Sequence, residues 1–131
     1  MKQPISTEAA PAAIGTYSQA VAVRGSLAGL VFISGQIPLD PVTMEVVSDD
    51  VGEQTEQVFR NLAAVAEAAG GSLSDLAKLT VYLTDLSNFG TVNEIMARYM
   101  AEPYPARAAI GVSELPRSVA VEIEAIMVLP E

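Results

Sequence analysis

Apolar residues recur at helical spacing between positions 50 and 70, and this pattern predicts the most regular helix of the chain. The residues that share one helical face are Val51, Val58, Phe59, Leu62, Val65, Ala66 and Ala69. Asp50 and Glu53 have the spacing of a capping box at the start of this stretch. Gly70-Gly71 supplies a left-handed stop at its end. We therefore predict a helix that starts at Asp50 and ends before Gly70.

A second helical pattern follows near position 91. Its apolar positions are Val92, Ile95, Met96, Tyr99 and Met100. Thr91 and Glu94 have the spacing of another capping box. We predict that this helix starts at Thr91 and ends before Pro103.

The remaining apolar segments have the pattern of strands. We predict strands over Tyr17–Arg24, Leu30–Ser34, Leu76–Thr84, Arg107–Val112 and Val119–Leu129, with a further short strand near Glu45–Ser48. Gly25 to Gly29 would be the turn of a hairpin between the first two. The first fifteen residues, rich in proline and alanine, are predicted to form an irregular arm.

This order of elements predicts an α+β fold in one domain, residues 1–131, with both helices layered on one face of a sheet. The opposite face would then be uncovered. Because several apolar strand residues point to that face, we expect a second copy of the chain to cover it.

Charge and composition narrow the class of function. The chain has 7 basic and 16 acidic residues, a net charge of −9. So few cations disfavour a nucleic-acid partner and an anionic membrane surface. The chain contains no cysteine and no histidine, which removes thiolate nucleophiles, histidine bases and the usual zinc ligands. The N-terminus has no continuous apolar stretch typical of a secretory signal, so the expected location is cytoplasmic.

Two groups of residues are candidates for chemistry. Alternation along the last strand places Glu122 and Glu124 on one face, either as ordinary surface acids or as groups that need a proton, water or a cation. Arg107, Ala109 and Gly111 likewise share a face of their strand. An arginine beside small residues is suited to bidentate capture of a small carboxylate, but the spacing alone favours an internal ion pair with one of the acids.

Six segments together resemble the RidA (YjgF-type) reactive-intermediate deaminase family. They are GTYSQA at 15–20, SGQIPLDP at 34–41, QTEQVFRNLAAVAEAAG at 54–70, KLTVYLTDLSNFGTVNE at 78–94, YPAR at 104–107 and VEIEAI at 121–126. The resemblance covers nearly the whole chain in the same order. It implies a chorismate-mutase-like α+β fold, assembled as a homotrimer with sites between subunits.

The resemblance also implies an activity, that of a 2-iminobutanoate/2-iminopropanoate deaminase. Such an enzyme hydrolyses enamines and imines, for example 2-aminoacrylate and 2-aminocrotonate, to 2-keto acids and ammonia, with no cofactor and no metal. The alternative is a protein that only binds or senses small 2-keto acids in the same cleft.

By position, the resemblance assigns roles to particular residues. Arg107 would hold the substrate carboxylate, Glu122 would position water, and Tyr17 would complete the catalytic group. The residues expected to line the substrate pocket are Ser34, Gly35, Asn93 and Ala109. Three positions depart from the common family pattern: Thr16 stands at a usual proline, Met44 at a usual glycine and Ala109 at a frequent cysteine.

Overall fold

The computed structural model describes residues 2–24 and 29–130. Its strands are β1 (Lys2–Ile5), β2 (Ala20–Val23), β3 (Leu30–Gln36), β4 (Leu76–Leu83), β5 (Ala106–Gly111) and β6 (Val121–Val128). Its helices are α1 (Val51–Ala68), α2 (Phe89–Tyr99) and the short 3₁₀ turns η1 (Leu73–Asp75), η2 (Leu86–Asn88) and η3 (Pro116–Ser118).

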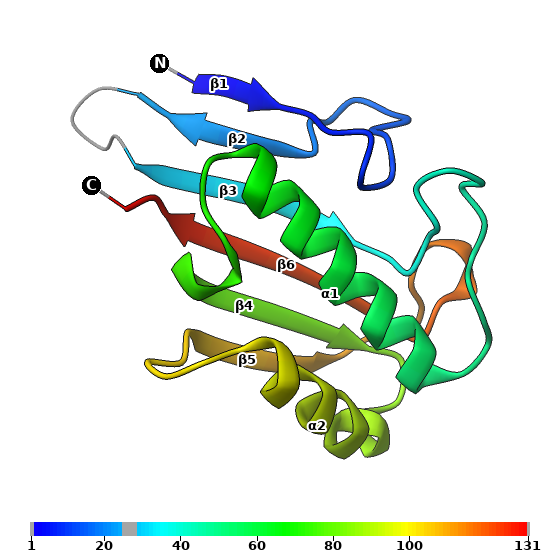
Figure 1. Ribbon diagram of the computed structural model, residues 1–131. Helices are drawn as coiled ribbons and strands as arrows, with labels where there is room; N and C mark the ends of the chain where they lie inside the picture. The colour runs from blue at the N-terminus through cyan, green and yellow to red at the C-terminus, as the bar shows by residue number, and fades with distance from the viewer. Residues whose placement is uncertain (1, 25–28, 131) are drawn as a thin grey trace.

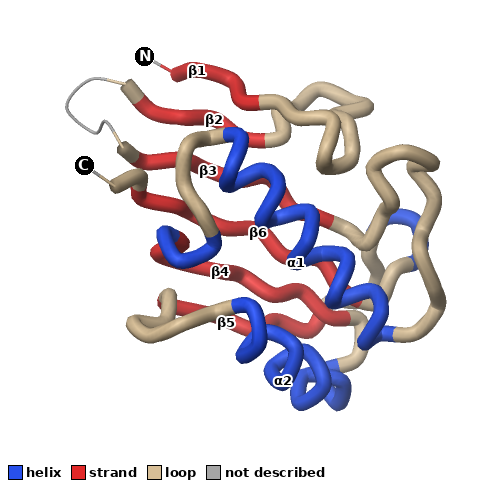
Figure 2. The backbone as a smooth tube through the Cα atoms, in the orientation of Figure 1, coloured by secondary structure: helices blue, strands red, loops and turns tan. Residues whose placement is uncertain are grey.

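The strands form one mixed sheet in the order β1-β2-β3-β6-β4-β5. Neighbouring strands are antiparallel except β4 and β5, which run parallel and are joined through α2. Both long helices lie across the same face of the sheet (Figure 1), and the tube in Figure 2 shows that neither of them crosses the other face. The predicted α+β fold with two helices on one face is confirmed.

Period-two alternation separates the two faces of the sheet. On β6, Val121, Ile123 and Met127 are fully buried and point toward the helices, while Glu122 and Glu124 point to the opposite face. The register pairs Tyr82 of β4 with Glu122, so their side chains lie on this same open face. The predicted common face of the two glutamates is therefore confirmed, and β6 is a central strand.

The open face carries large apolar side chains that this single chain leaves partly in water. Phe32 on β3, Ile110 on β5 and Val128 on β6 remain 46%, 42% and 46% exposed. Exposed apolar side chains grouped on one face are typical of a surface that contacts another protein. No helix in the described part of the chain is long and apolar enough to cross a membrane.

Helix α1 has the predicted ends. The Asp50 side chain accepts a hydrogen bond from the backbone N–H of Glu53, at 2.9 Å, while the backbone N–H of Asp50 donates to Ser48 rather than to Glu53. The cap therefore has one half of the predicted capping box. Gly70 has a φ of 99°, the left-handed conformation that glycine adopts after a helix.

Helix α2 starts earlier than predicted. Its first residue is Phe89, and Thr91 lies inside the helix, so the predicted capping box at Thr91 is wrong. The physical reason is the preceding 3₁₀ turn: Asp85 accepts a hydrogen bond from the backbone N–H of Ser87, and Asn88 already has helical dihedrals. The chain is thus already coiled when it reaches Phe89.

Three predictions about the strands need correction or completion. The N-terminal arm is not irregular throughout, because residues 2–5 form edge strand β1, which pairs with β2. The segment 45–48 is not a strand; it contributes only an isolated bridge between Leu39 and Val46. The predicted hairpin of β2 and β3 is confirmed in its pairing, whereas residues 25–28 of its turn lie outside the described residues.

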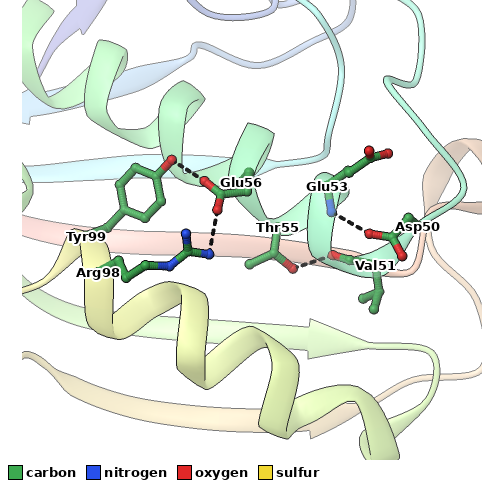
Figure 3. Close-up of polar contacts among 7 residues, drawn as sticks. All are labelled: Asp50, Val51, Glu53, Thr55, Glu56, Arg98 and Tyr99. Carbon is green, nitrogen blue, oxygen red and sulfur yellow. Dashed lines mark hydrogen bonds and ion pairs between the residues drawn. The ribbon is translucent and has the colours of Figure 1, made fainter.

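Side chains between α1 and α2 fix the position of α2. Arg98 of α2 donates to Glu56 of α1 at 2.7 Å, and the Tyr99 hydroxyl donates to the other oxygen of the same carboxylate (Figure 3). The Tyr99 ring stacks on Phe59 with 5.2 Å between ring centroids. These contacts matter for function because α2 carries the residues that surround Arg107.

Candidate functional site

Glu122 lies on the open face of the sheet, directly beside Gly35 of β3. A Cβ atom added to Gly35 would stand 3.0 Å from the carboxyl carbon of Glu122 and would overlap its Oε2 atom. The glycine thus provides the space that the carboxylate occupies. Strand β3 is irregular at this point, since its register with β6 shifts between Ile33 and Gln36.

A cavity of about 540 Å³ opens next to this carboxylate. Its lining comprises Pro11, Ala12, Ile14, Tyr17, Gln19, Ser34, Gly35, Gln36, Ile37, Leu39, Met44, Pro116, Arg117 and Glu122. Four of the predicted site residues, Tyr17, Ser34, Gly35 and Glu122, therefore share one cavity. Its volume is in the range of small-molecule sites, and apolar side chains make up much of its wall.

The neighbouring segment is held by Ser34 and Gln19. The Ser34 hydroxyl donates to the carbonyl of Ser18 at 2.6 Å, and the Ser34 N–H donates to the carbonyl of Gln19 at 3.0 Å. The buried Gln19 side chain in turn donates to the carbonyl of Pro11 at 2.7 Å. These bonds fix the chain on both sides of Tyr17, whose side chain is 53% exposed. Tyr17 is therefore an exposed residue at the cavity. Ser34 fixes the backbone of residues 18 and 19 beside it.

The environment of Glu122 favours its protonated form. Burial raises the pKa of the Glu122 carboxyl above its ordinary value, and the negative charge of Glu124 raises this pKa further. Glu124 itself accepts a hydrogen bond from the Tyr82 hydroxyl at 3.1 Å. A half-buried carboxyl with a raised pKa is suited to exchange protons closer to neutral pH than an ordinary glutamate.

Arg107 lies in a different place, on the face of β5 that α2 covers. Its Nη1 atom donates to the Asn93 side-chain oxygen at 2.7 Å, and its guanidinium carbon lies 4.7 Å above the centre of the Phe89 ring. The cation–π contact and this hydrogen bond hold the guanidinium against the helix. A second cavity, of about 490 Å³, is lined by Asn93, Met96, Ala97, Met100, Tyr104, Pro105 and Arg107.

The charge of Arg107 is not neutralised by a carboxylate in the described part of the chain. Within residues 2–24 and 29–130 the ion pair found is Arg98 with Glu56, so the internal ion pair that the spacing favoured for Arg107 does not form among these residues. The guanidinium is oriented by Asn93, a neutral acceptor. Such an arginine is prepared to bind an anion.

The sheet separates Arg107 from Glu122 within one chain. Arg107 pairs in register with Leu79, whose buried side chain lies on the helix-covered face, whereas Glu122 pairs with Tyr82 on the open face. The two cavities have no described lining residue in common. Ala109 follows Arg107 on the same side of β5 by strand alternation but is absent from the described lining of both cavities. A single chain therefore does not bring all predicted site residues together.

The sequence analysis assigned no role to Phe89, whose ring packs against the Arg107 guanidinium. Phe89, Asn93 and Met96 all contact the guanidinium, and they follow one another at helical spacing on α2. This i, i+4, i+7 pattern is present in the sequence, but the expected helix starts two residues too late to include Phe89. Among the described residues no cluster of three His, Cys, Asp or Glu side chains is placed to hold a metal ion.

The chain is similar in sequence and in structure to known proteins. The family model described as endoribonuclease L-PSP matches residues 7–129. The chain is 47% identical to a mouse protein named 2-iminobutanoate/2-iminopropanoate deaminase, over 98% of this chain and 92% of that protein. It superposes on the crystal structure of RidA from an Antarctic Psychrobacter with a TM-score of 0.91 and 52% identity, covering 97% of this chain and 99% of that one. The structure of Escherichia coli TdcF with bound serine is also similar, with a TM-score of 0.87 and 40% identity over 98% and 99% of the two chains.

Proposed function

Because this chain belongs to the endoribonuclease L-PSP family, which includes the YjgF and RidA proteins, we propose that it hydrolyses reactive enamines and imines to 2-keto acids and ammonia. Relatives named reactive intermediate deaminase and 2-iminobutanoate/2-iminopropanoate deaminase support this class of reaction. The observation that carries the proposal is the Arg107 guanidinium, which forms no ion pair among residues 2–24 and 29–130 and contacts Phe89 and Asn93, where it is ready to bind a carboxylate.

A second copy of the chain completes the proposed site. Arg107 and Glu122 lie on opposite faces of the sheet, so Arg107 of one copy would meet Glu122 of its neighbour. Association of copies through the open face would bury the partly exposed apolar residues Phe32, Ile110 and Val128. The assembly we propose is a homotrimer, with the sites in the clefts between copies.

The proposed chemistry needs only positioning and one proton-exchanging group. The enamine first tautomerises to the imine, whose carbon is electrophilic. Arg107 holds the carboxylate, and Glu122 holds a water molecule that adds to this carbon. The carbon–nitrogen bond then breaks, the nitrogen leaves as ammonia, and the keto group remains. Orientation and charge stabilisation of this kind require no histidine or cysteine.

The charge of the chain disfavours the activity that the word endoribonuclease in the family description would indicate. RNA cleavage requires an RNA-binding surface, and 7 basic residues against 16 acidic ones provide little attraction for phosphates. We therefore propose a small carboxylate-bearing molecule as the substrate, without a nucleic-acid or membrane partner.

We expect the purified protein to accelerate imine hydrolysis. A serine or threonine dehydratase would generate 2-aminoacrylate or 2-aminocrotonate in place, and the release of pyruvate or 2-ketobutyrate would be followed with and without the protein. Release at the spontaneous rate, together with saturable binding of 2-ketobutyrate, would contradict the enzymatic function and favour a binding protein.

The contact between Gly35 and Glu122 gives a test of the proposed role of Glu122. Gly35→Ala should displace the Glu122 carboxylate, because the added Cβ overlaps Oε2, the end of a flexible side chain that can swing away. We expect kcat/KM to fall at least about tenfold, with little change in the melting temperature. Gly90→Ala is the matched control, since a Cβ at that position in α2 meets nothing within 4 Å; that variant should keep full activity. Equal activity of the two variants would argue against a catalytic Glu122.

A further inference from the structure

The cavity beside Glu122 is lined by a positively charged side chain, Arg117, that the proposed mechanism does not use. Arg117, in η3, lines this cavity together with Glu122, and among its described lining residues these two carry the formal charges. The loop before β6, which contains η3, lies beside the loop that follows β3, at one end of the molecule (Figure 1). Arg117 connects these loops by donating from Nη1 to the carbonyl of Met44 at 3.2 Å.

The backbone at this rim is strained. Arg117, Ser118 and Met44 have φ values of 59°, 57° and 59°, and they are the non-glycine residues with left-handed backbone in the described part of the chain. Non-glycine residues in this conformation are strained, and strain of this kind collects at functional sites. Here the strained residues fall in the two loops that Arg117 joins.

The charge of Arg117 is available to a ligand. No ion pair involves Arg117 among residues 2–24 and 29–130, and its hydrogen bond to Met44 occupies one nitrogen of the guanidinium fork. The side chain is exposed at the cavity. In a chain with a net charge of −9, an unpaired arginine at a cavity rim favours an anionic ligand.

The shape of the cavity indicates what lies between the two charged groups. In the single chain the cavity has a volume of about 540 Å³, in the range of small-molecule sites. Apolar walls from Ile14, Ile37 and Leu39 are suited to a short aliphatic chain. A ligand that contacts both the apolar walls and Arg117 has an aliphatic carbon chain with an anionic group at its far end.

We propose that Arg117 is a specificity-determining residue that binds a second carboxylate at the far end of the substrate side chain, so that the site takes imines of dicarboxylic amino acids. This inference rests on the proposed function, in which Arg107 of the neighbouring copy holds the first carboxylate. Water adds to the imine carbon and ammonia leaves, as with a monocarboxylic imine, so the products are a 2-oxo dicarboxylate and ammonia.

A matched ligand pair tests this role independently of catalysis. 2-Oxoglutarate and 2-oxopentanoate have the same carbon chain and differ only in a distal carboxylate or methyl group. Titration calorimetry would measure the binding of both to the unsubstituted protein and to Arg117→Met, Arg117→Lys and Arg60→Met. Arg60 is exposed on α1 and lines neither of these two cavities. Arg60→Met changes the net charge by the same amount as Arg117→Met and is therefore the matched control. Hydrolysis of the imines of glutamate and norvaline, each generated by an amino acid oxidase, would be measured in parallel.

We expect the protein to bind 2-oxoglutarate about five- to tenfold more tightly than 2-oxopentanoate, as a partly exposed charge-assisted hydrogen bond allows. Arg117→Met should remove this preference, Arg117→Lys should keep part of it, and Arg60→Met should keep all of it. Equal binding of the two acids, or equal weakening of both by Arg117→Met, would overturn the proposal. If the preference depends on Arg117 but neither imine is hydrolysed, carboxylate selection by Arg117 stands and the proposed deaminase activity fails.

Discussion

Substitution of Arg107 by alanine is expected to lower kcat/KM for 2-aminoacrylate-derived imine by about 100-fold or more, equivalent to about 2.7 kcal/mol. The guanidinium is the proposed anchor of the substrate carboxylate, and the methyl side chain of alanine offers this carboxylate neither a charge nor a hydrogen-bond donor. Arg107→Lys should lose about tenfold, since lysine keeps the charge but lacks the planar fork that stacks on Phe89. The measurement is the dehydratase-coupled release of pyruvate.

Two controls separate a loss of binding from a loss of structure. Arg60→Ala removes an exposed arginine from α1 and should leave the rate unchanged. The melting temperature of Arg107→Ala should stay close to that of the unsubstituted protein, because the lost contacts are at the surface. More than half the original activity in Arg107→Ala would exclude the assigned role.

Mixed assemblies extend the same experiment to the site between copies. If Arg107 and Glu122 act from different copies, inactive Arg107→Ala and Glu122→Gln chains refolded together should regain about one quarter of the unsubstituted activity. That fraction follows from random mixing, in which a site needs one intact residue from each of two neighbours. No recovery in mixed assemblies, shown by mass spectrometry to contain both chains, would place the two residues in one functional unit within a chain.

Substitution of Glu122 by glutamine is expected to lower kcat by about 100-fold while changing KM little. Glutamine keeps the shape of the side chain beside Gly35 but cannot accept a proton from water. In the unsubstituted protein, activity should rise with pH through the raised pKa of Glu122. Glu124→Gln should move this rise to lower pH, because the charge of Glu124 contributes to raising the pKa of Glu122. A pH profile unchanged by Glu124→Gln would contradict this assignment.

The same raised pKa predicts that Glu122→Gln, which lowers activity, gains stability relative to the unsubstituted protein as pH rises from acid to neutral. The folded protein holds the Glu122 proton more tightly than the unfolded chain, so this group stabilises the fold below its ordinary pKa. That contribution is lost as pH rises through the raised value. Glu122→Gln cannot titrate, so its free energy of unfolding relative to the unsubstituted protein should increase from acid to neutral pH. Urea unfolding at both pH values, at equal protein concentration, measures this difference.

The helices and most strands were predictable because local patterns determine them. Helix α1 combines an apolar face with Asp50 at its start and Gly70 at its end, and all of these signals are local. Strand β1 was missed because KQPI is mostly polar and contains Pro4, which is tolerated only where β1 stands, at the edge of the sheet. The start of α2 was misplaced because the turn capped by Asp85 leads directly into Phe89.

The strand patterns predict which candidate residues share a face, but they do not predict how the candidate residues are arranged in space. Alternation within one strand groups Glu122 with Glu124, and Arg107 with Ala109, yet it does not say which group faces the helices. That depends on the register of β5 against β4 and of β4 against β6, which only the folded sheet determines. The rim formed by Arg117 and Met44 joins residues 73 positions apart, and no pattern within either segment predicts this contact.

The position of β6 also has a consequence for how the chain folds during synthesis. This strand follows all the other described elements in sequence, yet it lies in the middle of the sheet, between β3 and β4. Until residues 121–128 have left the ribosome, no strand of the described sheet is present that can join β1-β2-β3 to β4-β5. The chain therefore has to complete its sheet after nearly all of the described residues have been made, with its apolar segments exposed until then.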